Sequence, residues 1–385
     1  MSDNPTATNR AGGVAFWAVG AILLLVMPLL NILPPEDSWF HLSDFSLNRF
    51  GKFLAFGILA LGLDLIWGYT GILSLGQGVF FGLGAYCMGM HLMLTIGKES
   101  VYGTDMPDFM VWNQVKELPL FWKPFYSFPV AVIGAILVPM LFALVFGFFA
   151  FRSRIKGVYF AIITQALALV AWLVFNRNDT NLGGTNGLTD FKQVIGYRLS
   201  EPGTQRVLYI ITVLCLGASY LFCQWIIRSR AGRVLVAVRD SEKRVVFSGY
   251  TPANYKLFVF VVAAALAGLA GMLYAPQVGI ITPAQIGVLP SLEMVIWVAV
   301  GGRASLAGAV LGAVSVNYGR SVLTNYFPEL WPFILGGLFV LVVLLFPDGL
   351  IGMMRKAKSL LSRRKPDGGE PVVPAEKAAV LEGKH

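Results

Sequence analysis

Charged residues are scarce in this chain. Asp, Glu, Lys and Arg together make up 13% of its 385 residues, and 56% of the residues are hydrophobic. In soluble domains, roughly a quarter of the residues are charged. Together with a mean hydropathy of +0.68, this composition excludes a water-soluble globular protein and predicts an integral membrane protein.

Histidine, cysteine and the common catalytic motifs are also scarce or missing. The histidines are far apart, at His41, His91 and His385. The cysteines Cys87, Cys215 and Cys223 all lie in apolar runs, as small core residues do. The sequence contains no GxxxxGK[ST], HExxH or GxSxG motif. We therefore expect no catalytic residue, no metal site and no cofactor in this chain, and any ATP chemistry on partner proteins.

Long apolar runs are what the chain has instead. Runs near 20 residues match a hydrocarbon core about 30 Å thick, and unbroken runs favour helices over the alternating strands of a barrel. We predict an all-α, polytopic transmembrane bundle in one membrane domain over residues 11–353. A polar segment, 1–10, precedes it, and a basic tail, 354–385, lacks apolar periodicity and is predicted to be disordered.

The bundle is expected to hold about ten helical segments. The runs expected to span the membrane are 11–33, 49–67, 71–96, 128–151, 157–175, 207–227, 257–276 and 331–351. The first run lacks a small-residue cleavage site, so we interpret it as an uncleaved span rather than a signal peptide. The stretch 289–323 is too long for one span and is interrupted by Gly301, Gly302 and Arg303, which predicts a pair of short or re-entrant helices.

Basic residues sort the loops into two sides. The turn RSRIK at 152–156, the polar stretch at 228–256 and the segment after 351 are rich in Lys and Arg, whereas the loops 97–127 and 176–206 show no such excess. By the positive-inside rule, the first group faces the cytoplasm, and so do both termini. The same rule explains the net charge of +9 better than nucleic-acid binding does.

Residues 228–256, which we call the polar island, are more than a return between two spans requires. The island contains seven Lys or Arg residues and two acidic residues, whereas the shorter turn RSRIK contains three basic residues. Its mixed valines and charges predict short amphipathic helices at the membrane surface. We interpret it as a docking surface for a protein partner; the alternative is a solvated basic loop that binds anionic lipid.

A few polar side chains lie within apolar runs. Asp64 and Glu293 would each cost roughly 2.5–3.5 kcal/mol as charges at the bilayer centre, so they need partners or a water-lined cavity. Either a structural hydrogen bond or contact with the solute would explain them. Ser74 and Gln77 are spaced i, i+3, on one face of an expected helix, where a neutral polar solute could use them.

Two glycine-rich stretches also have more than one interpretation. The glycines of residues 68–90 suit either close helix packing or the lining of a solute path. NDTNLGGTNGL, at 178–188, is a plug, a binding site for an external partner or simply a loop.

Five pieces of the sequence, in this order, resemble the permease subunits of ABC importers of the branched-chain amino acid type, the family that contains LivM. They are GYTGILSLGQGVFFGLGAY, LGGTNGL, SRAGRVLVAVRDSEKRVVFSGY, AALAGLAGMLYAPQVGII and AVGGRASLAGAVLGAV. The resemblance covers residues 49–351. Within the family, GLTDFK, PSLEMVIWVAVGGR and FPELWPFILGGLFVLVVLLFPDGL are more similar to the urea permease subunits, UrtC. Gln77 stands where many relatives have His, and Lys243 and Arg244 replace small residues of the cytoplasmic signature.

The resemblance implies a heteromeric importer in the bacterial inner membrane. Its other parts would be a second, homologous permease, two ATP-binding subunits that hold ATP and Mg, and an external solute-binding protein, with membrane lipid but no nucleic acid as a further partner. The polar island would be its coupling region. The candidate coupling residues are Gly232, Arg233, Arg239, Asp240, Glu242 and Gly249.

The resemblance predicts urea as the solute, with branched-chain amino acids as the alternative. Charge separates them, because an amino acid zwitterion gains from a helix amino terminus or a fixed charge pair, whereas urea needs only hydrogen-bond donors and acceptors. Rivals of another class are a nontransporting scaffold and an ion-coupled secondary transporter, in which Asp64 and Glu293 would be coupling sites. The candidate pathway residues are Asp64, Ser74, Gln77 and Glu293.

Overall fold

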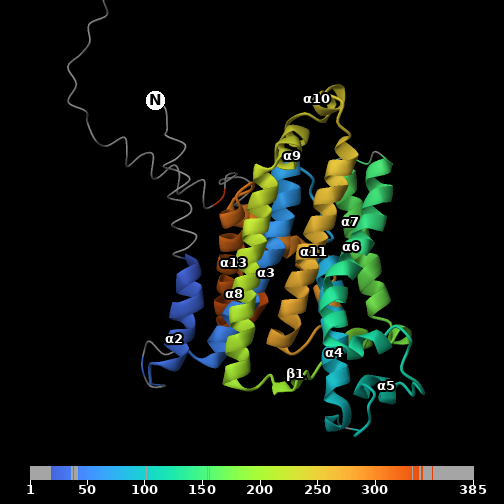
Figure 1. Ribbon diagram of the computed structural model, residues 1–385, viewed down its shortest axis with the longest axis vertical. Coiled ribbons are helices and arrows are strands. Elements are labelled where there is room, and N and C mark those ends of the chain that lie inside the picture. Colours follow the sequence, from blue (N-terminus) through green and yellow to red (C-terminus); the bar gives the residue numbers. More distant parts are fainter. Residues whose placement is uncertain are drawn as a thin grey trace, which may run out of the picture.

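The computed structural model describes residues 19–35, 38, 42–100, 102–153, 155, 157–331, 333–337, 340 and 349. In this part of the chain, six helices are long and apolar enough to cross a membrane, and two more form a bent pair. They run side by side as a bundle (Figure 1). The predicted helical membrane protein is confirmed. The segments 1–18 and 351–385 and most of 331–350 lie outside the described residues, so the count of ten, the complete first span, the disordered tail and the cytoplasmic termini stay predictions.

The candidate spans follow the apolar runs closely. They are α3 (Asp44–Thr70), α4 (Gln77–Ile96), α6 (Phe128–Arg152), α7 (Val158–Phe175), α8 (Pro202–Arg228) and α11 (Pro252–Val278). The bent pair is α12 (Val288–Gly301) and α13 (Leu306–Tyr326), whose axes differ by 120°. The predicted break at 301–303 is therefore confirmed.

Shorter elements fill the ends of the bundle. They are η1 (Ile22–Val26), α2 (Met27–Ile32), α5 (Asp108–Trp112), α9 (Arg230–Asp240), α10 (Glu242–Phe247) and the antiparallel strands β1 (Gln193–Val194) and β2 (Tyr197–Arg198). Single 3-10 turns lie at Gly97–Glu99, Lys123–Tyr126, Asn178–Thr180, Gly184–Asn186, Pro283–Gln285 and Pro328–Leu330.

The start of the second described span was predicted wrongly. The expected helix over 71–96 begins only at Gln77, because Gly71 takes a left-handed conformation (φ 74°) that ends α3, and residues 71–76 stay non-helical. Such backbone needs partners at membrane depth. The Leu75 N–H finds one in the Thr164 hydroxyl of α7, at 2.9 Å.

Close helix packing explains several glycines. α11 lies against α3, α4 and α6. A Cβ added at Gly268 of α11 would lie 2.2 Å from the Ala135 carbonyl of α6, and one at Gly84 of α4 would lie 2.2 Å from the Gly268 carbonyl. The backbones of three helices thus meet at these positions, which favours the packing interpretation of this part of the glycine-rich stretch.

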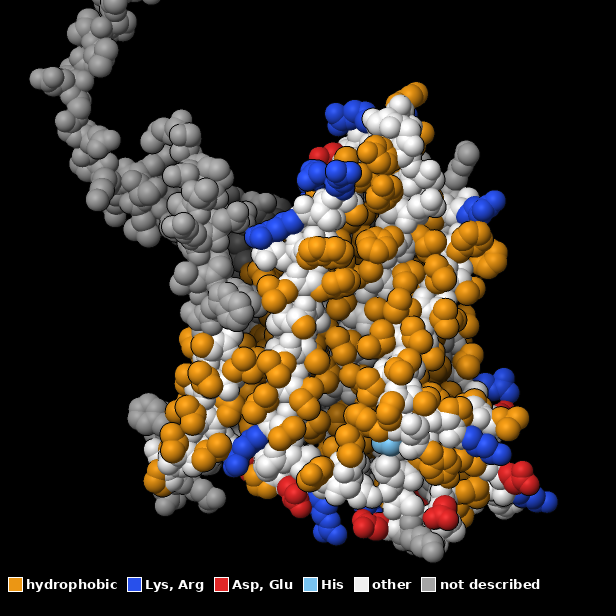
Figure 2. Space-filling view, viewed as in Figure 1, with side chains coloured by type: hydrophobic (Ala, Val, Ile, Leu, Met, Phe, Trp, Pro, Cys, Tyr) orange, Lys and Arg blue, Asp and Glu red, His pale blue; other side chains and the backbone are white. Residues whose placement is uncertain are grey.

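The bundle has a buried centre and an apolar outer face. α3 and α4 are buried over most of their lengths, whereas α6 and α7 expose many large apolar side chains. Hydrophobic side chains cover the middle of the face in Figure 2, and charged side chains lie toward the two ends. This distribution is the one expected of a protein surrounded by lipid or other membrane subunits.

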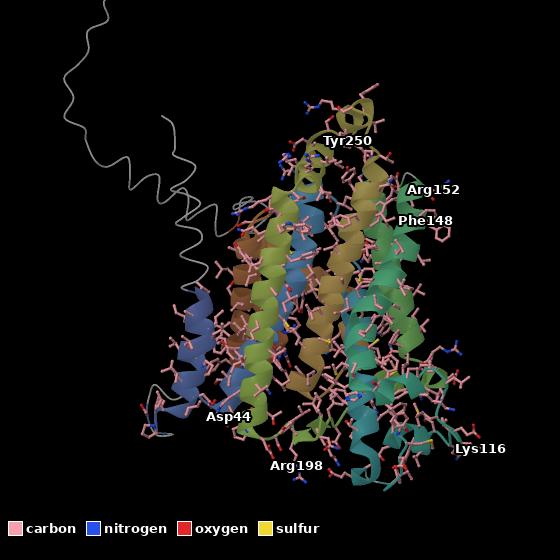
Figure 3. The ribbon with its side chains drawn as sticks, viewed as in Figure 1. Asp44, Lys116, Phe148, Arg152, Arg198 and Tyr250 are labelled. Atoms are coloured by element: carbon pink, nitrogen blue, oxygen red, sulfur yellow. The ribbon has the colours of Figure 1, made fainter. Side chains whose placement is uncertain are left out.

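The loops sort to the two ends as the charges predict. Arg152 and Tyr250 lie at one end of the bundle, and Asp44, Lys116 and Arg198 lie at the other (Figure 3). We call the first the α9–α10 end. At the opposite end, the loop that holds LGGTNGL packs on the bundle, since Leu188 pairs with Ile281 through backbone hydrogen bonds of 2.8 and 2.9 Å.

We expect Gly268→Ala to lower the stability of the purified protein by about 1–3 kcal/mol, because the added methyl group overpacks the contact with α6. Gly217→Ala on α8 is the matched control, since a Cβ there meets no described atom within 4 Å. Thermal unfolding in detergent measures both. Equal melting temperatures for the two variants would contradict the packing account.

Candidate functional site

A tight turn sets the direction of the polar island. The Ser229 hydroxyl caps α9 by accepting the Gly232 N–H at 3.3 Å. A Cβ at Gly232 would lie 2.1 Å from the Ile227 carbonyl, so only glycine allows α9 to leave α8 this closely. Leu235 and Val238 are buried while the opposite face is exposed, as predicted for an amphipathic helix.

The island ends in an exposed aromatic tip. Phe247 at the end of α10 is 90% exposed, and Val246 and Tyr250 beside it are also exposed. Lys243 and Arg244 lie on the same short helix, which occupies the extreme of the α9–α10 end (Figure 1). An apolar ring surrounded by basic residues at the extreme of a membrane protein suits a groove on a protein partner. Sequence reasoning weighed the charges of SEKRVVFSGY and missed Phe247.

The candidate coupling residues divide into two groups. Arg233 and Asp240 are exposed. Arg239 is exposed too and pairs with Asp240 at 3.3 Å, but its guanidinium also donates to the Gly68 carbonyl of α3 at 2.9 Å. The Glu242 carboxylate pairs with the Lys256 ammonium of α11 at 3.0 Å. Arg239 and Glu242 thus attach the island to the bundle.

The two glycines among these candidates shape the chain. Gly232 lies in the α8–α9 turn, and Gly249 takes a positive φ of 84° in the turn that follows α10. Contact of these six residues with an ATP-binding subunit stays a prediction.

Residues 302–305, between α12 and α13, are called the hairpin tip. Asp64 of α3 binds this tip. Its carboxylate accepts the Ala304 N–H at 2.8 Å, and the Tyr69 hydroxyl donates to the Ala304 carbonyl at 3.1 Å. Ala304 itself has a positive φ of 57°, which is strained for an alanine. Arg303 lies over the Trp67 ring, 4.3 Å from its centroid. The fully buried Asp64 is therefore placed for the structural hydrogen bond, one of the two roles considered for it.

The island and the hairpin tip contact the same turn of α3. Arg239 binds the carbonyl of Gly68, and the next residue, Tyr69, binds Ala304. A Cβ at Gly68 would lie 2.5 Å from the Ala304 nitrogen, so the tip also packs directly on this turn. α9 and the hairpin tip are thus connected by contacts with a single helical turn.

Ser74 and Gln77 do not share a helix face as expected. Ser74 lies in the non-helical segment 71–76, and Gln77 is the first residue of α4. The two are nonetheless neighbours, because the Gln77 amide donates to the Ser74 hydroxyl at 3.4 Å. Both side chains are buried. Their part in a solute pathway stays a prediction.

A cavity of about 950 Å³ opens between α3, α11, α12 and α13. Of the four candidate pathway residues, only Glu293 is among the described residues that line it. Glu293 is 5% exposed and pairs with Arg320 of α13 at 2.5 Å. Arg49 and Lys52 of α3 also line the cavity, beside rings that include Phe56, Tyr274 and Trp297.

Sequence reasoning missed three of the cavity's charges. The sequence did contain a signal, because Lys52 and Arg320 interrupt apolar runs. However, Arg49 and Lys52 fall at the start of an expected span, where basic residues usually mark the membrane boundary. Among the described residues, no group of three His, Cys, Asp or Glu side chains is placed to hold a metal ion.

The chain thus forms a helical membrane bundle with a broken helix pair and a basic segment at one end. The family model described as "Branched-chain amino acid transport system / permease component" matches residues 46–343. The chain belongs to this family of ABC transporter permeases.

Named relatives agree with this family. The permease protein LivM of Salmonella typhimurium is 26% identical over 360 residues, covering 87% of this chain and 76% of LivM. LivM of Escherichia coli K12 is 26% identical, over 77% of this chain and 68% of LivM. BraD of Pseudomonas aeruginosa is 24% identical, over 77% and 91% of the two chains. All three are named for high-affinity branched-chain amino acid transport. The closer similarity to urea permease subunits is not supported by these comparisons, and no solved structure gives a significant match.

Asp64→Leu and Asp64→Asn separate the hydrogen bond from the charge. Leucine leaves the Ala304 N–H without an acceptor, which should cost about 1–3 kcal/mol of stability. Asparagine keeps a side-chain oxygen and should unfold close to the wild-type temperature. Thermal unfolding of the purified variants is the measurement, and an equal loss in both would show that the carboxylate charge, not the acceptor, is required.

Proposed function

We propose that the chain is a permease subunit of an ATP-driven importer of branched-chain amino acids in the bacterial inner membrane. The family and its named relatives support this solute class. The cavity supports it independently, because it holds a fixed charge pair, Glu293 with Arg320, and two further cations. A zwitterion gains from such fixed charges, whereas urea, the solute favoured by the short sequence motifs, has no charge to place against them.

Transport by such a permease requires ATP-binding partners. The exposed tip at Phe247 and the basic face of α9–α10 are suited to bind an ATP-binding subunit, with Mg and ATP held by that subunit. On the visible face, Lys and Arg side chains lie at both ends, but most of the Asp and Glu side chains lie at the end opposite α9–α10 (Figure 2). The basic excess at the α9–α10 end supports a cytoplasmic position. The second permease and the external solute-binding protein complete the proposed importer.

The coupling route we propose runs from the island to the cavity. α9 contacts the turn Gly68–Tyr69, which contacts the hairpin tip. From the tip, α12 leads to Glu293, about 14 Å away at 1.5 Å per helical residue. A shift of α9 on nucleotide binding would thus tilt α12 and alter the cavity. Such switching requires contacts that differ between the two states of the importer.

An uptake assay tests the solute and the energy source. Cells or proteoliposomes carrying the complete importer should take up labelled leucine, an excess of unlabelled valine should compete, and an excess of urea should not. Uptake should persist when the proton gradient is collapsed and ATP is maintained. Competition by urea alone would support the urea importer, and loss of uptake with the gradient would support ion coupling.

Phe247→Glu should weaken the binding of the ATP-binding subunit by about tenfold or more, because it places a charge in the centre of the proposed contact. Phe327→Glu is the matched control, since Phe327 is also an exposed aromatic residue, outside the polar island. Copurification and titration of the subunit onto the membrane-reconstituted permease measure the effect. Equal binding by both variants would contradict docking at α10.

A further inference from the structure

Lys52 is a cation in the cavity wall that shares the carboxylate of Glu293 only at a distance, without an ion-pair contact. It lies in α3, eight residues after Asp44, or about 12 Å from the start of the helix. Its ammonium nitrogen is 5.9 Å from the centroid of the Phe56 ring and 5.8 Å from that of the Tyr274 ring. Within the described part of the chain, Lys52 makes no hydrogen bond and no ion pair, whereas the nearby Arg320 pairs with Glu293.

The cavity as a whole carries an excess of positive charge. Arg49, Lys52 and Arg320 face a single described carboxylate, that of Glu293. A charged side chain within a membrane protein persists where it has a partner or serves a solute or ion pathway. Since Arg320 accounts for Glu293, the unpaired ammonium of Lys52 is placed for an anionic group of the solute.

Two amide side chains, Gln277 and Asn48, also belong to the cavity wall. Gln277 of α11 is 6% exposed, and its amide nitrogen donates to the Thr212 hydroxyl at 2.6 Å. Its amide oxygen is buried and has no hydrogen-bond partner in the described part of the chain, and the same holds for the side-chain oxygen of Asn48. Both residues line the cavity with Lys52. The Gln277 oxygen packs against α3, since a Cβ added at Gly51 would lie 2.2 Å from it. Both oxygens are thus enclosed in the cavity wall and do not reach the solute.

An apolar wall completes the set of contacts. Phe56 of α3, Tyr274 of α11 and Trp297 of α12 cluster at the cavity, with ring centroids 5.5 Å apart for Phe56 and Tyr274 and 4.9 Å apart for Phe56 and Trp297. Rings of this kind bury the branched side chain of an aliphatic amino acid. The Lys52 ammonium and the aromatic wall thus match the carboxylate and the side chain of such a solute.

We propose that Lys52 binds the α-carboxylate of the amino acid in this cavity, and that the aromatic wall receives its branched side chain. The inference rests on the proposed function, because it names the site at which the same solute is held. Urea would leave the Lys52 ammonium without an anion. The permease therefore discriminates by charge, in addition to any selection by an external binding protein.

Binding to the assembled permeases and ATP-binding subunits, reconstituted without the solute-binding protein, tests the site directly. Leucine should raise the melting temperature of the complex. 4-Methylpentanoate, which keeps the carboxylate but lacks the ammonium, should raise it less, and 3-methylbutylamine and urea should leave it unchanged. Because this series uses the wild-type protein, it does not depend on whether a variant folds. Stabilisation by the amine but not by the carboxylate would overturn the assignment of Lys52.

Variants of Lys52 then locate the effect. Lys52→Gln should weaken leucine binding by at least about tenfold, because it leaves the carboxylate without its cation. Lys52→Arg should restore most of the affinity, which a purely structural role for the lysine stem would not explain. Lys116→Gln is the matched control, since Lys116 is an exposed lysine at the end of the bundle opposite α9–α10 (Figure 3) and is not among the residues that line the cavity.

The outcomes separate this site from the proposed function. If the wild-type importer with its binding protein takes up leucine, but Lys52→Gln binds leucine as tightly as wild type, the site is wrong and the function stands. If the wild-type importer takes up no branched-chain amino acid, the proposed function is wrong, and the assigned solute falls with it. Should Lys52→Gln fail to assemble, Lys52→Met, which keeps the aliphatic stem, provides the second neutral variant.

Discussion

The hydrogen bond from the Ala304 N–H to the Asp64 carboxylate is the interaction on which the arrangement of this permease depends. A helix pair bent by 120° leaves backbone groups at the bend without helical partners, and these groups need partners elsewhere. Asp64 accepts one of them from the buried centre of α3, and Tyr69 donates to the other side of the same residue. The bend is therefore fixed at the turn of α3 that also receives Arg239 from the polar island.

This shared turn gives a physical route between two distant parts of the molecule. The island lies at one end of the bundle (Figure 1), while the cavity opens between α3 and the bent pair. α12 is short, it ends at the hairpin tip, and it carries Glu293 into the cavity. Because packed helices move as rigid bodies, displacement of the tip would reach the cavity wall without unfolding any helix.

The sequence predicted most of the fold but less of the site. Apolar length placed the spans, and Gly301–Arg303 placed the break, because both follow from local composition. Asp64 and Glu293 were recognised as costly charges, yet their partners were not, since Ala304 and Arg320 approach only through tertiary packing. For the same reason the inward direction of Arg239 and the unpaired Lys52 could not be predicted. Ser74 was assigned to a helix because the apolar run begins at Gly71, whereas residues 71–76 are non-helical and α4 begins only at Gln77.

The central claim is that the hairpin tip moves together with α9 when the importer binds ATP. Spin labels at Ala237 on α9, at Ala307 beside the tip and at Leu144 on α6, all exposed positions, allow the distances to be measured in nucleotide-free and ATP-bound importer. The account predicts that the 237–307 distance stays constant while the 307–144 distance changes. A changed 237–307 distance with a constant 307–144 distance would contradict it.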